Sequence, residues 1–544
     1  MHDQKATVGS IGALLLGSGI AFAQPRPGAR EAFTLLEATI ADVHAAMSSG
    51  SLTCRELVQG YLDRIEAYDK QGPHLNAIQT INPRALEEAV RLDDARERGA
   101  GLVGPLHCIP VLLKDQVETS DMPTTYGSAV FADFIPSRDA TVVTKLKSAG
   151  AIILAKTTMG EFAGRYVGSA FGVVRNSYDP ARTAGGSSGG SGSGVAANFG
   201  MVGIGEDTGG SIRAPAAFQS LVGLRPTVPL VSRFGMMPAK PANDTLGPMT
   251  RTVEDAAKLL DVIAGYDPND PMTAYAVGHV PDSYTAFLRT DGLQRARLGI
   301  VRDPMDARTD IASEDYEKVR TVIDAAIRDL KSFGAEVVDG VVIPDVPQRM
   351  IQMYDENSYE TEEATNRYLA EHANAPLKTL REILLTGKVT PWRAASLLNA
   401  VGKSTNDVSY LPILNAKEDL RRTVLKLMAD FELDALVYAT SDHQPTVIAD
   451  DVLTNAKTED AYGRGTNRRL SPVIGFPAIT VPAGFTVDGL PVGLELMGRP
   501  FTEGMLLQYA YAFEHRTHHR RPPGATPALN HSARPSPDLG RDCY

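Results

Sequence analysis

The sequence predicts an α/β fold: a single large α/β/α domain in which helices flank a mixed, mostly parallel central sheet. Short apolar runs with strand character alternate along the chain with amphipathic helical stretches, a pattern typical of such folds. The 544 residues, 43% hydrophobic and 22% charged, have the composition of a soluble globular protein. Because no internal repeat divides the chain, we expect one continuous domain.

The first half of the chain is expected to begin with helices and continue with buried strands. Apolar residues in the first helical stretch recur at helical spacing. Thr53 and Glu56 form a capping box that starts a second helix. The remaining expected elements are helices near 39–47, 83–97 and 140–148, and strands at 109–113, 152–154 and 201–204.

The second half is less regular. Residues 226–250 are rich in Pro and Gly and are expected to form a loop, whereas residues 345–465 are polar and helical in character without a clear motif. We therefore expect 345–465 to be a variable helical cap or insertion within a domain spanning 24–516, followed by a poorly ordered Pro-rich tail at 517–544. Further expected elements are helices at 253–264, 316–333 and 505–516, and strands at 298–301, 336–338, 478–481 and 494–496.

The N-terminal residues have the pattern of a secretory signal peptide. Lys5 precedes an apolar stretch at 8–22, and Ala21 and Ala23 are the small residues expected before a cleavage point at Ala23-Gln24. The apolar stretch is shorter than the roughly 20 residues that span a membrane, so we expect no stable membrane anchor. The sequence thus predicts a signal peptide at 1–23 and a secreted or periplasmic protein.

Charge and cysteine content exclude some function classes. A net charge of −11, spread along the chain, makes nucleic acid or an anionic membrane surface an unsuitable partner. Cys54, Cys108 and Cys543 are too few and too scattered for a disulfide framework, and no C-x-x-C pair indicates a metal site. One pair can form in an oxidising compartment, which leaves one cysteine over.

Two clusters of glycine and serine, at 185–190 and 207–213, carry the strongest chemical signal. Glycine beside serine lets the backbone approach a reacting group and leaves N–H groups free to bind a developing negative charge. Lys114 follows an apolar run upstream. The pKa of a free lysine amine is about 10.4, but burial lowers it, and a neutral amine can act as the base for a serine nucleophile. The combination predicts acyl transfer by Ser211 without a histidine.

Several other interpretations of these residues remain open. The first cluster is also compatible with a flexible linker or a nucleotide-binding loop, although the Gly-Lys-Ser/Thr ending and the dinucleotide glycine pattern are absent. Lys114 can instead form a surface salt bridge with Asp115. A triad that uses His107, or a nucleophilic Cys108, is compatible with sequence order alone because triads are defined by geometry.

Taken together, these motifs resemble the amidase signature family of serine hydrolases. The resemblance runs from about 39 to 516 and rests on fixed segments with family-like spacing. Two residues depart from the family pattern: Cys108 stands where Gly is usual, and Glu206 where Thr is usual. The matching segments are 104–110, Lys114-Asp115, 139–141, 149–151, 185–190, 209–213, 222–227, 476–478 and 489–493.

The resemblance implies a catalytic role for each matched residue. Ser211 would be the acyl-accepting nucleophile, Ser187 the bridging serine after a cis peptide bond, and Lys114 the terminal base. The main-chain N–H groups at 208–211 would form the oxyanion hole, and Ala163 would line the acyl pocket. The implied binding residues are therefore Thr208, Gly209, Gly210 and Ala163.

The function that follows is metal-free hydrolysis of an aryl or alkyl carboxylic amide through an acyl-enzyme, without a cofactor. Alternatives are an esterase or carbamate (urethane) hydrolase with the same triad, the amidase component of a tRNA-dependent amidotransferase, and a non-catalytic binding protein. The expected partner is a small-molecule amide with a hydrophobic or aromatic group, bound by a monomer or homodimer. Residues such as Met236, Met237, Met353 and Tyr354 suggest the apolar group, although packing in the core explains them equally.

Overall fold

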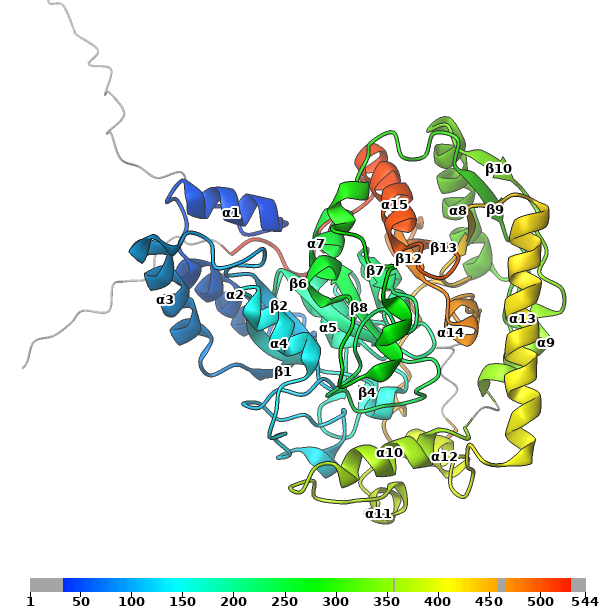
Figure 1. Ribbon diagram of the computed structural model, residues 1–544, viewed down its shortest axis with the longest axis horizontal. Coiled ribbons are helices and arrows are strands. Elements are labelled where there is room, and N and C mark those ends of the chain that lie inside the picture. The colour runs from blue at the N-terminus through cyan, green and yellow to red at the C-terminus, as the bar shows by residue number, and fades with distance from the viewer. Residues whose placement is uncertain (1–32, 356–357, 458–464, 530–544) are drawn as a thin grey trace, which may run out of the picture.

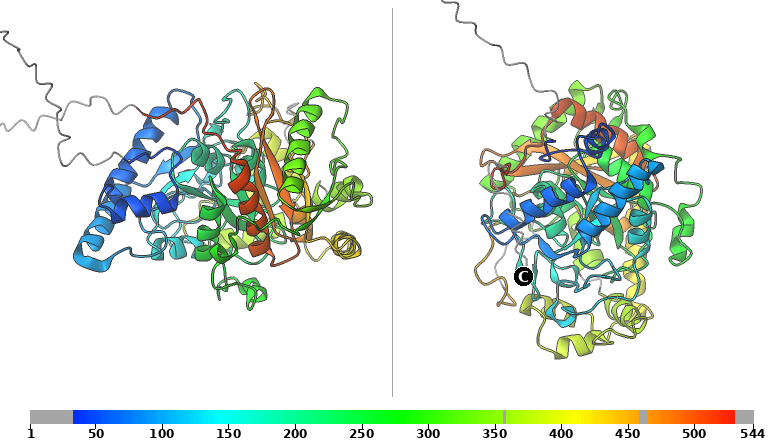
Figure 2. Two further views of the ribbon diagram at one scale, coloured as in Figure 1. Left: turned by 90° about the horizontal axis from the view of Figure 1, so that it is seen from above. Right: turned by 90° about the vertical axis from the view of Figure 1, so that its left-hand side faces the viewer.

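The computed structural model describes residues 33–355, 358–457 and 465–529. The predicted signal peptide, with its cleavage point, lies outside these ranges. Within them, one sheet of 11 strands runs through the molecule. Helices pack against this sheet, as Figures 1 and 2 show. The prediction of an α/β fold with a mixed central sheet is therefore confirmed. The order of the strands is β1-β3-β2-β6-β8-β7-β12-β13-β11-β9-β10.

The strands that carry the site are parallel neighbours. Strand β2 lies between β3 and β6 and is parallel to both, whereas β1 is antiparallel to β3. Every residue of β2, β3 and β6 is buried. Strands covered on both faces are expected to be continuous apolar runs, and these segments match that description. Their bounds are β1 Ile78–Ile81, β2 Pro110–Lys114, β3 Ile152–Thr157 and β6 Val202–Asp207.

The middle of the sheet is antiparallel, and its far edge is parallel again. Strand β8 pairs with β6 and β7, and the hairpin of β12 and β13 continues the sheet to β11. Strands β11, β9 and β10 are parallel. Strand β8 lies inside the segment for which the sequence predicts a loop. The bounds are β7 Val222–Arg225, β8 Thr245–Thr250, β9 Arg297–Ile300, β10 Glu336–Val338, β11 Ala435–Ala439, β12 Ala478–Phe485 and β13 Pro491–Met497.

The helices begin where the sequence places N-caps. Thr53 and Glu56 form the predicted capping box at the start of α2, and Thr39 with Asp42 forms another at α1. In Figure 1 α1, α2 and α3 lie together at the β1 end of the sheet. Outside the cap region and the site, the helices are α1 Ile40–Ser48, α2 Cys54–Tyr68, α3 Ala85–Ala95, α4 Thr141–Ser148, α7 Val253–Ile263, α8 Glu314–Ser332, α14 Leu470–Ile474 and α15 Glu503–Thr517.

The segment 345–465, for which the sequence predicts one cap, divides into two parts. Helices α10, α11 and α12 contribute to an aromatic-rich cluster with Tyr126, Phe131 and Phe162, and Figure 1 shows them side by side, apart from α13. Strand β11, from the same segment, lies in the central sheet between β13 and β9. The expectation of a single insertion over the sheet is thus corrected. The helices are α9 Val346–Met350, α10 Thr361–Ala370, α11 Leu380–Leu385, α12 Pro391–Leu398 and α13 Leu411–Asp430.

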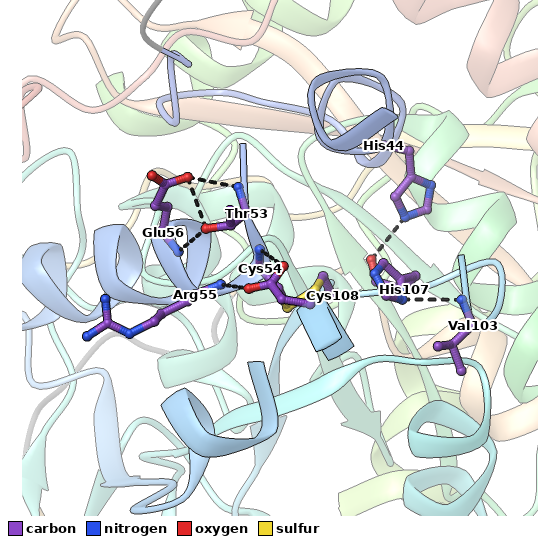
Figure 3. Close-up of a disulfide and its surroundings, with 9 residues drawn as sticks. His44, Thr53, Cys54, Arg55, Glu56, Val103, His107 and Cys108 are labelled. Atoms are coloured by element: carbon purple, nitrogen blue, oxygen red, sulfur yellow. Dashed lines mark hydrogen bonds between the residues drawn. A yellow bond between two sulfur atoms is a disulfide. The ribbon is translucent and has the colours of Figure 1, made fainter. Parts of the chain in front are cut away.

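A disulfide and an ion pair connect segments of the domain that are distant in sequence. Cys54, the first residue of α2, and Cys108, just before β2, form a disulfide with a Cα–Cα distance of 5.5 Å (Figure 3). After α15, Arg520 pairs with Glu37 at 2.7 Å, so this start of the Pro-rich tail packs on the domain. Residues 530–544, Cys543 among them, lie outside the described ranges. Within those ranges, we find no helix with the length and apolar character needed to cross a membrane.

Candidate active site

The predicted base, Lys114, is the last residue of β2 and is completely buried. Because β2 and β6 are parallel, their carboxyl ends meet at one edge of the sheet, where ligands of open α/β sheets bind. The Lys114 amine donates hydrogen bonds to Ser187 Oγ at 2.7 Å and to Glu206 Oε2 at 2.8 Å. The alternative salt bridge to Asp115 is absent, since Asp115 instead accepts hydrogen bonds from Thr125 and Gly127.

Burial and a neighbouring charge shift the pKa of Lys114 in opposite directions. Burial disfavours the ammonium form and is the larger effect, whereas the carboxylate of Glu206 favours it. The net result is a Lys114 pKa below that of a free lysine. A lowered pKa is what a lysine needs to accept a proton from a hydroxyl near neutral pH.

Ser187 precedes a short helix that consists largely of Gly and Ser, α5 Gly189–Ala196. All of its residues are buried, so the alternative of a flexible linker is excluded here. Ser191 donates to the carbonyl of Ile204 at 3.2 Å, which ties α5 to β6. The peptide bond between Gly186 and Ser187 is cis.

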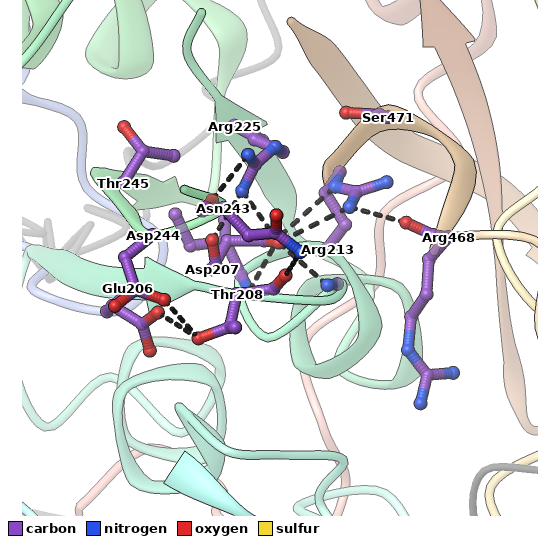
Figure 4. Close-up of polar contacts among 12 residues, drawn as sticks. Glu206, Asp207, Thr208, Arg213, Arg225, Asn243, Asp244, Thr245, Arg468 and Ser471 are labelled. Carbon is purple, nitrogen blue, oxygen red and sulfur yellow. Dashed lines mark hydrogen bonds and ion pairs between the residues drawn. The ribbon is translucent and has the colours of Figure 1, made fainter. Parts of the chain in front are cut away.

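Ser211 lies in the loop between β6 and helix α6 Arg213–Phe218. Asp207 shapes this loop, because its carboxylate accepts hydrogen bonds from Gly210 N at 2.7 Å and Ile212 N at 3.2 Å. Arg213 and Arg225 form buried ion pairs with the same carboxylate (Figure 4). Burial favours the neutral acid, but the two guanidinium groups outweigh it and hold the pKa of Asp207 well below its usual range.

The hydrogen bond from Gly210 corrects one predicted role. Since the Gly210 N–H is committed to Asp207, it is not available to bind an oxyanion. The N–H groups of Thr208, Gly209 and Ser211 donate to no other residue in the described part of the chain, and they are the remaining candidates. At Thr208 only the main-chain N–H can take this role, because the hydroxyl lies 2.6 Å from Glu206 Oε1 and 2.8 Å from Asp244 Oδ1.

The nucleophile candidate lines a cavity of about 360 Å³. Ser211 is 9% exposed, and its carbonyl accepts a hydrogen bond from Ser188 N at 3.3 Å, which holds the two serine loops together. Ala163, predicted to line an acyl pocket, is in the wall of this cavity. The structure therefore joins Lys114 to Ser187, holds the loops of Ser187 and Ser211 together, and places Ser211 and Ala163 in the cavity wall.

The cavity walls also contain residues that the sequence does not single out as site residues. Trp392 lines the cavity, and the guanidinium of Arg165 stacks on its ring at 4.1 Å. The Tyr354 hydroxyl covers Gly209 so closely that an added Cβ would overlap it. Arg468 covers Gly210, whose φ of +108° favours glycine. No local motif marks these residues, whereas Glu206 could have been found as a second carboxylate at the end of a buried strand.

The methionines considered for substrate binding lie elsewhere. Met236, Met237 and Met353 are buried in core clusters and do not line this cavity, whereas Tyr354 does. Within the described ranges, no group of three or more His, Cys, Asp or Glu side chains is arranged to hold a metal ion.

Fold and site together define an α/β protein whose buried lysine and two serines meet at the carboxyl ends of parallel strands. The family model described as Amidase matches residues 56–507. The chain is 35% identical to a glutamyl-tRNA(Gln) amidotransferase subunit from Exiguobacterium sp., and the match covers 88% of this chain and 98% of that one. It is 34% identical to a probable amidase of Arabidopsis thaliana, and the match covers 90% of this chain and 92% of that one.

A solved structure gives the same result. The crystal structure of native peptide amidase from Stenotrophomonas maltophilia is 36% identical, with a TM-score of 0.79, and the match covers 90% of this chain and 98% of that one. The chain therefore belongs to the amidase family, as its motifs predict, and is an amidase-type hydrolase.

Proposed function

We propose that the protein hydrolyses carboxylic amides through an acyl-enzyme on Ser211. The observation that carries the proposal is the buried hydrogen bond between Lys114 and Ser187, placed beside a loop that presents Ser211 to the cavity. A lysine that loses its proton readily can activate a serine hydroxyl without a histidine.

The reaction is a proton relay in two halves. Neutral Lys114 accepts the hydroxyl proton of Ser187, and Ser187 accepts that of Ser211 as its oxygen attacks the amide carbon. The oxyanion forms against the main-chain N–H groups of Thr208, Gly209 and Ser211. The C–N bond then breaks, the amine leaves with the relayed proton, and water hydrolyses the ester on Ser211 by the reverse sequence.

The cavity supports a substrate with an aromatic or otherwise planar group. Tyr354 and Trp392 place aromatic rings in its wall, and the guanidinium groups of Arg469 and Arg165 lie over these rings. We therefore place aryl amides first among the substrates. Esters and carbamates remain substrates for the same site, because they form the same acyl- or carbamoyl-enzyme.

A panel of matched compounds tests this function. Aryl and alkyl amides, with the ester and carbamate of the same acyl group, are compared by kcat/KM for the wild type and for Ser211→Ala. We expect amide turnover by the wild type and its loss in Ser211→Ala. Wild-type turnover of esters or carbamates but not amides would move the function to the alternative class, and turnover by Ser211→Ala would remove Ser211 from the reaction.

One relative favours a second candidate function, that of an amidotransferase component. The 35% identity to the glutamyl-tRNA(Gln) amidotransferase chain from Exiguobacterium sp. spans nearly the full length of that protein. Such a component would co-purify with partner chains from its native host, whereas the proposed hydrolase would purify active by itself. Affinity purification followed by an amidase assay separates the two.

We further propose that the protein is exported. Two features support export: the signal-peptide pattern at 1–23 and the buried disulfide between Cys54 and Cys108, a bond typical of oxidising compartments. N-terminal sequencing of the protein from a secreted or periplasmic fraction should begin at Gln24. Recovery of the intact N-terminus from the cytoplasm would contradict the proposal.

A further inference from the structure

Beneath the candidate nucleophile, four buried side chains form a continuous hydrogen-bonded chain. Lys114 donates to Glu206 Oε2 at 2.8 Å, the Thr208 hydroxyl lies 2.6 Å from Glu206 Oε1, and the same hydroxyl lies 2.8 Å from Asp244 Oδ1. Lys114, Glu206 and Asp244 are 0% exposed and Thr208 is 5% exposed. An acidic side chain thus lies directly against the candidate base.

Counting hydrogens shows which carboxyl group carries the charge. A threonine hydroxyl has one hydrogen, so it can donate to Glu206 or to Asp244 but not to both. If both contacts are hydrogen bonds, one of the two carboxyl groups must itself carry a proton. The Lys114 amine faces Glu206, which favours Glu206 as the ion.

Asp244 fits the protonated partner. It makes no ion pair with any residue in the described ranges. Its Oδ2 accepts main-chain hydrogen bonds from Ala239 at 2.8 Å and Lys240 at 2.9 Å, and the Lys240 N–H is shared with Oδ1 at the longer distance of 3.1 Å. Oδ1, which has the weaker main-chain contact, is therefore the oxygen that carries the proton and donates it to the Thr208 hydroxyl. Burial, followed by the charge of Glu206, raises the pKa of Asp244 to about 7, in agreement with this assignment.

We propose that Glu206 is a positioning residue that holds the Lys114 amine toward Ser187 and sets how strongly that amine binds its proton. The chain from Asp244 through Thr208 keeps Glu206 ionised, since each group donates toward the next. Without the carboxylate of Glu206, burial would be opposed only by the smaller effects of Asp207 and Asp244. Lys114 would then lose its proton at lower pH and become a weaker base. The titratable and charged groups around Glu206 are Lys114 on β2, Asp207 on β6, Arg225 on β7, Asp244 before β8, and Tyr126.

The inference rests on the proposed function. The test is designed so that failure of the inference and failure of the proposed function give different results. A fluorophosphonate probe labels an activated serine without a known substrate, so the rate constant for labelling Ser211 can be followed from pH 5 to 10 by intact mass. We compare wild type with Glu206→Gln, which keeps the size of the side chain, and with Glu206→Thr, which replaces the carboxylate by a shorter hydroxyl. Glu503→Gln is the control, because Glu503 is a buried carboxyl that contacts Thr227 instead of Lys114.

We expect the acid limb of the labelling profile to move to lower pH by about one unit or more in both Glu206 variants, with slower labelling at the plateau, while Glu503→Gln keeps the wild-type limb. A limb that stays in place, or moves to higher pH, in folded Glu206 variants overturns the inference and leaves the proposed function standing. Wild-type protein that is not labelled at Ser211 at any pH contradicts the proposed function, and the inference fails with it.

Discussion

The amine of Lys114 and the hydroxyl of Ser187 lie 2.7 Å apart, both fully buried or nearly so, at the carboxyl end of β2. This contact connects a strand of the sheet to the loop before α5, and it gives Ser187 a base that water cannot reach. A lysine held in this way can take a proton that a surface lysine cannot. The reactivity of Ser211 should therefore depend on this pair.

Replacing Lys114 should stop activation of the serine. In Lys114→Met the base is lost while the buried volume is largely kept, so we expect the labelling rate at Ser211 to fall by about 10²–10⁴-fold at neutral pH. Lys156→Met is the matched control, because Lys156 is equally buried on β3 but donates to Thr124 at 2.8 Å. Equal losses in the two variants would mean that burial of a lysine, not its contact with Ser187, is what matters.

The close contact between Gly209 and Tyr354 predicts a clash that can be relieved. A Cβ on Gly209 would overlap the Tyr354 side chain, so Gly209→Ala should displace the loop that carries Ser211 and lower kcat/KM by about 100-fold. In the double variant Gly209→Ala/Tyr354→Ala, removal of the ring leaves room for the new methyl group. Gly209→Ala should therefore lower kcat/KM less in the Tyr354→Ala background than in the wild type. A double-mutant cycle with no coupling between the two sites would contradict this geometry.

The disulfide should stabilise the N-terminal helices against the sheet. It joins residues 54 positions apart, so Cys54→Ser should lower the free energy of unfolding by about 2–4 kcal/mol. Cys108 has a φ of +64°, where glycine is favoured, so Cys54→Ser/Cys108→Gly should be more stable than Cys54→Ser/Cys108→Ala. Denaturant unfolding measures both effects.

A buried aspartate should make stability depend on pH. Asp255 on α7 accepts a hydrogen bond from Ile40 N at the start of α1, and burial raises its pKa to about 6. A raised carboxyl pKa means that the stability Asp255 contributes is complete below about pH 4 and is lost as pH rises through about 6. Asp255→Asn should therefore gain up to about 3 kcal/mol relative to wild type between pH 4 and 8.

Unfolding curves at several pH values test this dependence. Asp419→Asn provides the comparison, because it makes the same substitution at an exposed aspartate. If Asp255→Asn ran parallel to wild type, the charge of Asp255 would have no part in the pH dependence.

The site is predictable from the sequence where local motifs report on local structure. Lys114 follows an apolar strand, and the Gly–Ser clusters allow tight backbone approach, so the position of each can be read from its neighbours. The hydrogen bond from Gly210 to Asp207 cannot be predicted from neighbouring residues, because it depends on how the loop folds back on the end of its own strand. Side chains such as Tyr354 and Trp392 reach the cavity from distant segments without any pattern that marks them.

The fold, like the site, is predictable only where the local sequence determines the local structure. The sequence predicts loop at β8 because Gly247 and Pro248 disfavour strands, yet pairing with β6 and β7 on both sides overrides that preference. Strand β11 is not predicted from the sequence, because it follows a long polar segment of helical character. The sequence leaves the pairing of Cys54 with Cys108 open, since connectivity depends on the packing of α2 against the start of β2.

The most direct test of the proposed mechanism is the mass of the enzyme during turnover. Rapid acid quenching of the wild type with an aryl amide, followed by intact-mass analysis and peptide mapping, should reveal one acyl group on Ser211. The acyl adduct should be absent from Ser211→Ala. Turnover of the amide without an adduct on any serine, or with the adduct at another residue, would contradict the mechanism.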